Sequence, residues 1–413
     1  MQASRRAFLK GSALAMFGLG SAPMWLSRAV YAGEGPARRK KVLVAIFQRG
    51  AVDGLNVVVP FGEQRYYDLR PSIAIPKPDG TPRSAIDLNG FFGLHPALAP
   101  LKPIFDAQRL AIVDAVGSPD PTRSHFDAQD YMESGTPGYK GTNDGWMNRA
   151  LAKEAGTNSP LRAVSLGSNL PRSLRGRNDA IAINNLNEFQ IKDIRSSDSF
   201  ESMYASSVDT MLHGTGKETF DAIKIMQSLQ KQKYAAANGA RYPGGRFGQS
   251  LQQIARLIKA DVGLEVAFTD IGGWDTHVNE VGQNPAQGQL ANILGDFGNS
   301  LAAFYQDLGD RMEDVTLVTM SEFGRTAKEN GNRGTDHGHA NAMFVMGGDV
   351  RGGKVYGDWP GLQPEQLYEG RDLNLTTDFR DVLSELVSHH LGNRNLKAVF
   401  PGYENPRFRN ILG

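Results

Sequence analysis

KVLVAIF, at residues 41–47, is an apolar run that leads into the loop RGAVDGLN at residues 49–56. A run without polar alternation is typical of a strand buried on both faces, as in a parallel sheet covered by helices. Further runs of this kind predict four more strands, at residues 110–116, 264–268, 315–320 and 342–346. The sequence therefore predicts an α/β fold with a largely parallel central sheet flanked by helices.

The segments between these runs predict crossovers and one irregular region. Residues 288–312 carry apolar side chains at helical spacing, so the third and fourth runs and this helix predict a right-handed parallel βαβ unit. Short strands and turns are expected at residues 159–185 and helices at residues 200–234, 241–259 and 376–391, before an irregular, docked tail at residues 401–413. We expect a single domain at residues 41–413, with an elaboration at about residues 157–245.

The N-terminal segment has the features of an export signal. SRRAFLK at residues 4–10 is a twin-arginine signature, an apolar run follows, and VYA at residues 30–32 suits signal peptidase. We expect residues 1–32 to be a signal peptide read by the twin-arginine translocase and residues 33–40 to be a flexible lead-in. The mature protein would then be periplasmic or secreted. An uncleaved anchor is the alternative, but the run is too short and too rich in small residues for a stable membrane span.

Composition excludes several classes of protein. The chain has no cysteine, which rules out disulfides, cysteine nucleophiles, iron–sulfur clusters and thiolate zinc sites. Loss of the four basic residues of the signal would change the formal net charge from +1 to −3. A mildly acidic mature chain argues against nucleic acid as a partner.

The loops after the predicted strands carry the side chains of one composite site. In open parallel sheets, ligands bind beyond the carboxyl ends of the strands. Four of the runs end in loops that contain Asp53, Ser124, the pair Asp275 and His277, and Glu322. That shared position predicts that these residues lie together.

Three metal-type side chains follow one another closely before the last predicted strand. Asp336, His337 and His339 stand in the segment GTDHGH at residues 334–339, and His277 stands in a second short segment, GWDTH. Three of the eight histidines in the chain therefore fall in these two segments. Imidazole and carboxylate together suit zinc, manganese or iron better than calcium. The sequence therefore predicts a metal centre.

Long motifs resemble a known family. RGAVDGLN, TRSHFDAQD, GGWDTH, MSEFGRT, GTDHGHANAMFVMGG and RGGKVYGDWPGL resemble the domain-of-unknown-function 1501 (DUF1501) family over nearly all of the mature chain. By motif order that family resembles the alkaline phosphatase superfamily, which includes arylsulfatases and cofactor-independent phosphoglycerate mutases. The resemblance implies a three-layer sandwich, one or two divalent ions (zinc or manganese) and hydrolysis of a phosphate or sulfate ester.

The superfamily pattern assigns roles to the first four residues. Asp53 matches the first metal-binding aspartate, and Ser124 stands at the nucleophile position. Asp275 and His277 resemble the next ligand pair, at a tighter spacing than usual. Residue 119 is proline where a formylglycine precursor would stand, which disfavours a standard formylglycine sulfatase.

The later part of the pattern departs further from the superfamily. Glu322 falls where an Asp-His pair is expected, and Phe323 takes the place of the histidine. His339 resembles the final histidine ligand. Asp336 and His337 would then make up the missing ligand, in a single or altered metal site.

The implied chemistry assigns the remaining polar residues. Ser124, activated by a metal or a base, would attack the ester, Arg123 or Arg325 would steady its oxygens, and His125 would donate or accept a proton. The backbone N–H groups at the start of the helix near Ser124 would favour an anion. The expected substrate is a small anionic ester or an envelope glycan.

Plain structural roles stand beside each assignment. Ser124 also fits a helix N-cap, Asp53 a turn, and Asp336 a residue that orients a histidine. Glu322 could pair with Arg325. Two other functions stay open: a non-catalytic metal- and ligand-binding envelope protein of the same fold, and a mutase or transferase.

Overall fold

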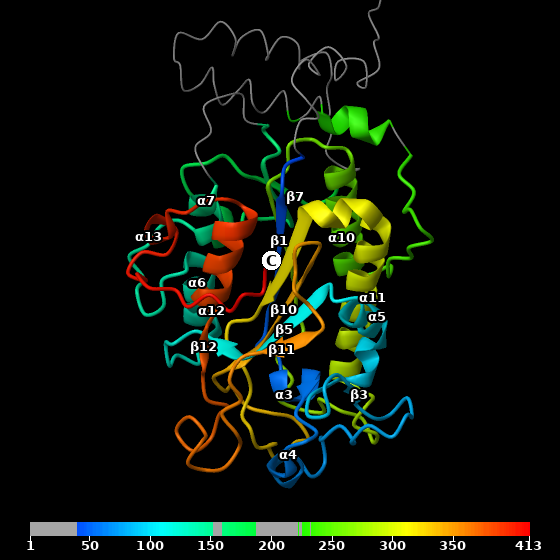
Figure 1. Cartoon of the computed structure of the whole chain (residues 1–413), viewed down its shortest axis with the longest axis vertical. Helices are drawn as coiled ribbons and strands as arrows, with labels where there is room; N and C mark the ends of the chain where they lie inside the picture. Colours follow the sequence, from blue (N-terminus) through cyan, green and yellow to red (C-terminus); the bar gives the residue numbers. More distant parts are fainter. Residues whose placement is uncertain (1–38, 152–158, 187–221, 223–224, 232) are drawn as a thin grey trace, which may run out of the picture. The chain divides into compact units, whose positions relative to one another are not determined.

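A mixed nine-stranded sheet forms the centre of the computed structural model, which describes residues 39–151, 159–186, 222, 225–231 and 233–413 (Figure 1). The strand order is β11-β5-β10-β9-β1-β8-β6-β7, and β12 also pairs with β5. The strands are β1 Val42–Gln48, β5 Leu110–Gly117, β6 Ala163–Leu166, β7 Ile181–Ile183, β8 Val266–Ile271, β9 Val315–Met320, β10 Asn341–Gly347, β11 Lys354–Tyr356 and β12 Thr377–Asp378. The predicted α/β class and the five predicted strands are confirmed.

Strand direction decides which loops meet. β1 is parallel to β8 and β9, β8 is parallel to β6, and β5 is parallel to β11 and β12. β10 alone is antiparallel to both of its neighbours, β5 and β9. The start of β10 therefore lies at the same edge as the ends of β1, β5, β8 and β9. This reversal brings the histidine segment that precedes β10 to the carboxyl edge of the sheet.

Two hydrophobic cores cover the two faces of the sheet. Successive side chains of a strand point to opposite faces, and in β1 Val42, Val44 and Ile46 join one core whereas Leu43 and Phe47 join the other. α10 and α11 pack on the first face, and α6, α7, α12 and α13 lie on the second (Figure 1). The result is a three-layer arrangement of helices, sheet and helices.

The helices have these bounds: α3 Gly54–Val57, α4 Gln64–Leu69, α5 Lys102–Asp106, α6 His125–Ser134, α7 Trp146–Ala150, α10 Arg246–Lys259, α11 Gln289–Leu308, α12 Phe379–Glu385 and α13 Leu396–Val399. Short helical turns are η1 Pro96–Leu101, η2 Arg172–Leu174, η3 Gly309–Asp314 and η4 Leu386–His390. A small second sheet has the order β2-β4-β3, from Val58–Val59, Gly93–Leu94 and Ile86–Asp87.

The predicted helix at residues 288–312 is α11, and it forms the crossover between the parallel strands β8 and β9. It ends earlier than predicted because Gly309, at φ 49°, takes a left-handed conformation that stops an α-helix. α10 is confirmed, and the tail is irregular with Ile411 and Leu412 buried, as expected.

Several expectations fall outside the described residues. These are the signal peptide, nearly all of the lead-in and most of the helices expected at residues 200–234. Among the described helices, none is both long enough and apolar enough to cross a membrane. The single-domain assignment with its elaboration stays a prediction.

Candidate metal centre

The loops at the carboxyl edge of the sheet approach one another very closely. Gly50, directly after β1, has φ 120°, and a Cβ there would lie 2.8 Å from the backbone nitrogen of Asp275. Its own N–H donates to Glu322 Oε1 at 2.8 Å. Glycine is required at this position because both the backbone conformation and the close contact exclude a side chain. Trp274, fully buried, anchors the loop after β8 by donating from Nε1 to the Ile271 carbonyl at 3.0 Å.

Arg325 joins these loops together. Its buried guanidinium donates to four backbone carbonyls, those of Gly50, Ala51, Trp274 and Thr335, at 2.8–3.2 Å. The Nη2 group also lies 2.6 Å from Asp275 Oδ1. A planar guanidinium with five donors suits this task, whereas lysine does not. Arg325 was predicted to steady substrate oxygens. In the structure its donors already bind oxygens of the protein.

Three histidines and one aspartate face one another above Arg325. His337 Nε2 lies 3.0 Å from His125 Nε2, 3.0 Å from His277 Nε2 and 3.2 Å from Asp275 Oδ1. Asp275 also reaches His277 Nε2 at 3.0 Å and His125 Nε2 at 3.6 Å. We call these four side chains the histidine cluster. His125, Asp275 and His337 form the one group in the described chain whose ligand atoms all lie within 4.8 Å, and His277 borders them.

The outer nitrogen of every histidine in the cluster faces an acceptor. His125 Nδ1 lies 2.8 Å from Glu322 Oε1, and His277 Nδ1 lies 3.1 Å from Asp336 Oδ1. His337 Nδ1 lies 3.0 Å from the backbone carbonyl of Arg123. Because these oxygens accept, a neutral ring at each position would carry its proton on Nδ1 and present a lone pair on Nε2.

Bare lone pairs at these distances repel one another unless a cation lies between them. Apart from a 3.4 Å contact from Arg325 Nη1 to His277 Nε2, no donor of the described residues faces the three nitrogens. Zinc ligands bonded at about 2.0–2.2 Å in a tetrahedral arrangement lie roughly 3.3 Å apart, close to the observed separations. Nδ1–H groups held by carboxylates and carbonyls are the usual outer partners of metal-binding histidines. The donor set therefore fits a divalent metal.

A metal ion and a proton can each place positive charge among the nitrogens of the cluster. The hydrogen bond to Glu322 raises the pKa of His125 above its usual value, although burial opposes it. Burial, and then the charges of His125 and Arg325, lower the pKa of His337, so its lone pair stays available. Burial would raise the pKa of Asp275, but the hydrogen bond from Arg325 outweighs it and the pKa is lowered. Without metal, a proton on His125 can occupy the space between the nitrogens.

Phe323 supports two of the rings. It stands where the resemblance expects a histidine, and it packs in a small buried cluster with Ala51 and Ala128. Its ring centroid lies 5.0 Å from that of His125 and 4.9 Å from that of His337. The departure at this position therefore supplies an apolar backing for ligands and not a ligand.

The cluster is open to solvent on one side. The side chain of Asp275 is 46% exposed and that of His277 is 38% exposed. Ser124, an exposed residue, stands between Arg123 and His125, which both contact the cluster. Its hydroxyl is the N-cap of α6 and accepts from the Asp127 N–H at 3.5 Å. The structural alternative for Ser124, a helix cap, is thus present.

Asp53 lies in a different site from the one expected. Its carboxylate is 1% exposed and is bound through both oxygens by Arg70, at 2.5 and 2.9 Å. Glu280, next to it, has its pKa raised well above the usual value by burial and by the charge of Asp53. Glu280 also accepts from Thr276 and Thr335, each at 3.0 Å. This buried network supports the loops that carry the cluster, and Asp53 contributes structure there.

Two further expected residues lie beside the cluster and outside it. His339 is buried and stacks on Tyr368 with ring centroids 4.2 Å apart. The Arg123 guanidinium binds Asp372 at 2.6 Å and Glu369 at 2.7 Å. Neither arrangement leaves the side chain facing the three nitrogens.

Glu322 and Asp336 hold the rings in place and do not face their inner nitrogens. Burial disfavours the charge of Glu322, but the hydrogen bonds from His125 and Gln129 outweigh it and its pKa is lowered. Gln129 Nε2 donates to Glu322 Oε1 at 3.0 Å, a role that the sequence analysis missed. Its position four residues after His125, on the same face of α6, is the signal that could have revealed it. His125, which was expected to transfer protons, is a member of the histidine cluster.

Comparisons with known proteins place this site in a family. No curated protein matches the chain in sequence. The crystal structure of PsFucS1 sulfatase from Pseudoalteromonas sp. is similar, with 11% identity and a TM-score of 0.38 over 92% of this chain and 75% of that one. The model of DUF1501, a protein of unknown function, matches residues 111–394, which include all four members of the histidine cluster. Since this match covers more than half of its length, the chain belongs to the DUF1501 family.

Proposed function

We propose that this chain is an exported, metal-dependent hydrolase of phosphate or sulfate esters. The observation that carries the proposal is the meeting of three Nε2 lone pairs with the Asp275 carboxylate. His125, Asp275 and His337 would hold the ion, with His277 as a fourth ligand. When bound, zinc would supply Lewis-acid stabilisation for charge that develops on an ester oxygen.

Residues of the chain would place and activate the ester. α6 begins at His125, a member of the cluster, and the free backbone N–H groups of a helix start favour an anion. The Ser124 hydroxyl, at that same helix start, is the nucleophile that we assign. Asp275, exposed on one side, leaves room for a substrate oxygen. Export by the twin-arginine translocase would deliver the protein folded, with its metal in place.

Elemental analysis of the exported protein tests the metal. Wild type should hold one equivalent of zinc, and Asp275→Ala/His277→Ala should lose it. Asp358→Ala/His389→Ala is the matched control, because it removes the same residue types from exposed positions outside the cluster. Wild type without metal after refolding with zinc or manganese would end the proposal.

A non-catalytic metal-binding protein is the second candidate, favoured by the capping role of Ser124. Three variants separate the two functions on p-nitrophenyl phosphate and sulfate. Ser124→Asn keeps a good helix cap but has no hydroxyl, Ser124→Ala loses both, and Ser124→Thr keeps both. A hydrolase that uses Ser124 loses turnover in the Asn and Ala variants with its metal retained. Equal turnover of the Asn variant and wild type would remove Ser124 from the mechanism.

A further inference from the structure

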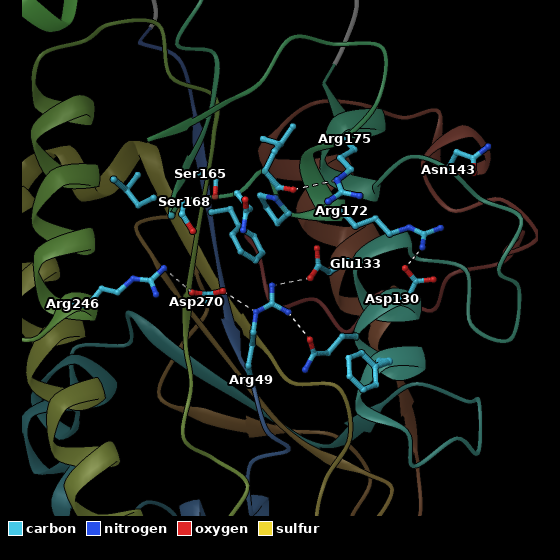
Figure 2. A pocket seen from close by; sticks show the side chains of 18 of the residues that line it. Arg49, Asp130, Glu133, Asn143, Ser165, Ser168, Arg172, Arg175, Arg246 and Asp270 are labelled. Atoms are coloured by element: carbon cyan, nitrogen blue, oxygen red, sulfur yellow. Dashed lines mark hydrogen bonds and ion pairs between the residues drawn. The ribbon is translucent and has the colours of Figure 1, made fainter. Parts of the chain in front are cut away.

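Figure 2 shows a polar cavity of about 670 Å³. Phe126 and Gln129, which line it, belong to the helix whose first residue is His125 of the histidine cluster. The cavity opens between α6, the end of β8, the loop after β6 and the start of α10. That volume is within the range of pockets that hold small ligands, about 300–1,000 Å³. Hydroxyl and amide side chains contribute much of its wall: Asn143, Ser165, Ser168 and Asn169.

The cavity and the cluster share one helix. α6 presents His125 to the cluster, while Phe126 and Gln129, on the same first turns, line the cavity. Gln129 accepts from Arg49 Nη1 at 2.8 Å and donates to Glu322, which holds His125. A ligand in the cavity would therefore extend from the proposed metal position and not from a separate face of the protein.

Cations outnumber carboxylates around the cavity, five to three. Arg49 is neutralised by Glu133 at 2.9 Å and Asp270 at 2.8 Å, and Arg172 is bound by Asp130. These pairs appear at the centre of Figure 2 and to its right. They leave the excess charge on the other cationic side chains.

Arg175 and Arg246 hold that excess. Arg175 donates to the carbonyl of Leu170 at 3.2 Å, and among the described residues no carboxylate lies within ion-pair distance of it. Arg246 is 68% exposed and lies 3.7 Å from Asp270, a carboxylate already bound by Arg49. Arg172 and Arg175 lie near each other on one wall of the cavity (Figure 2), and burial and then the charge of Arg175 lower the pKa of Arg172. A guanidinium group with spare donors is a site for a carboxylate, sulfate or phosphate group.

An aromatic ring stands at the rim of the same cavity. The Phe126 side chain is 90% exposed and lies next in sequence to the ligand His125. Phe126 is one of three large apolar side chains that the described part of the chain leaves exposed. The flat face of a ring packs on the C–H groups of a sugar, whose hydroxyl groups would meet the amide and hydroxyl wall.

We infer that the cavity binds an acidic oligosaccharide through an anionic group separate from the ester that reaches the cluster. The inference rests on the proposed function for its orientation, since the cavity would hold the body of the substrate. Arg175 and Arg246 lie on opposite sides of the cavity (Figure 2), so each would attract an anionic group of the substrate, and Phe126 would pack on a sugar ring. The substrate would therefore carry at least two anionic groups.

Binding without turnover tests this directly. The metal-loaded full chain is titrated by calorimetry with oligogalacturonate, sulfated dextran oligosaccharide, phosphorylated dextran oligosaccharide and neutral dextran oligosaccharide. We expect at least one acidic probe to bind and the neutral one not to bind, and the preferred acidic probe identifies the anion. Arg175→Gln/Arg246→Gln should weaken that binding by about tenfold or more, because it removes two charge-assisted contacts.

Controls keep the result interpretable. Arg83→Gln/Arg394→Gln removes two exposed arginines outside the cavity and should bind the probe as wild type does. Equal metal content in the cavity variant and wild type shows that the fold is intact. Phe126→Ala should weaken binding as well, with no change in its salt dependence.

Equal binding of acidic and neutral probes would overturn the inference, and so would wild-type affinity in the arginine variant. Absence of binding by all three acidic probes does so too. Turnover of p-nitrophenyl esters by wild type separates the two proposals. Turnover without acidic binding leaves the hydrolase and removes the cavity's role, whereas arginine-dependent binding without turnover leaves the cavity's role and removes the hydrolase.

Discussion

Glu322→Gln isolates the contribution of a buried carboxylate that holds one ligand. Glu322 Oε1 receives His125 Nδ1, Gln129 Nε2 and the Gly50 N–H, at 2.8, 3.0 and 2.8 Å. Glutamine has nearly the same shape, so the change removes the charge and turns one acceptor into a donor. The histidine would lose the anion that fixes its tautomer and raises its basicity.

The size of the effect follows from the hydrogen bond to His125. Hydrogen bonds to charged groups contribute about 1.5–3 kcal/mol and neutral ones about 0.5–1.5 kcal/mol, so the change should cost roughly 1–1.5 kcal/mol of metal binding. At about 1.4 kcal/mol per factor of ten, zinc affinity should fall roughly tenfold. That value is at the lower end of the roughly 10–100-fold range for such partners.

Competition with a fluorescent zinc chelator measures this affinity. Mildly alkaline pH is needed, because Glu322→Gln also weakens proton binding to His125 and would otherwise offset part of the loss. Glu404→Gln, the same change at an exposed position, is the control. Zinc affinity of Glu322→Gln equal to that of wild type would show that His125 does not bind the metal.

Three other predictions follow from contacts at the same edge. Metal binding must displace the proton of His125, whose pKa is raised. Zinc affinity should therefore fall as the pH decreases through that raised pKa and should level off above it. A flat pH profile in chelator competition would contradict this. Asp53→Asn breaks a buried pair with Arg70, so the free energy of unfolding in urea should fall by about 3–5 kcal/mol with metal content unchanged; loss of metal from folded protein would restore Asp53 as a ligand. Gly50→Ala should destabilise the fold by about 1–3 kcal/mol, since its φ of 120° and the nearby Asp275 nitrogen exclude a Cβ, and wild-type urea stability would refute the strain.

The sheet could be read from the sequence because its strands are buried on both faces. β1, β5, β9 and β10 were located to within about one residue at each end by apolar runs alone. β8 was placed too early and cut short, since Asp270 interrupts the apolar pattern inside the strand. That carboxylate is accommodated because it binds Arg49 at 2.8 Å, a partner far away in sequence. The apolar pattern also could not show that β10 runs antiparallel to its neighbours, because only the hydrogen bonds between the strands determine strand direction.

The site was predicted as a set of residues more accurately than as a set of roles. Asp275, His277 and His337 do meet, because their loops follow or precede strands that end at one edge. Asp53 has the same local sequence feature, an acidic residue after a strand. Only its ion pair with Arg70, which the sequence does not reveal, distinguishes it from a member of the cluster.

The histidines show the same limit. His339 lies two residues after His337, and its ring stacks on that of Tyr368 outside the cluster. His125 was given a proton-transfer role because it follows Ser124. Which ring nitrogen faces inward depends on Glu322, nearly two hundred residues later in the chain.

Arg325 alters how mutational scans of this chain should be interpreted. One guanidinium sets the spacing of the loops after β1 and β8 and of the histidine segment before β10. Substituting it would disperse the ligands without deleting any of them, so an inactive Arg325→Ala protein would report lost loop geometry and not lost chemistry. Lysine, with a single ammonium group, would not restore it. A scan that ranks positions by activity alone would therefore assign a catalytic role to a residue that only holds the loops of the site together.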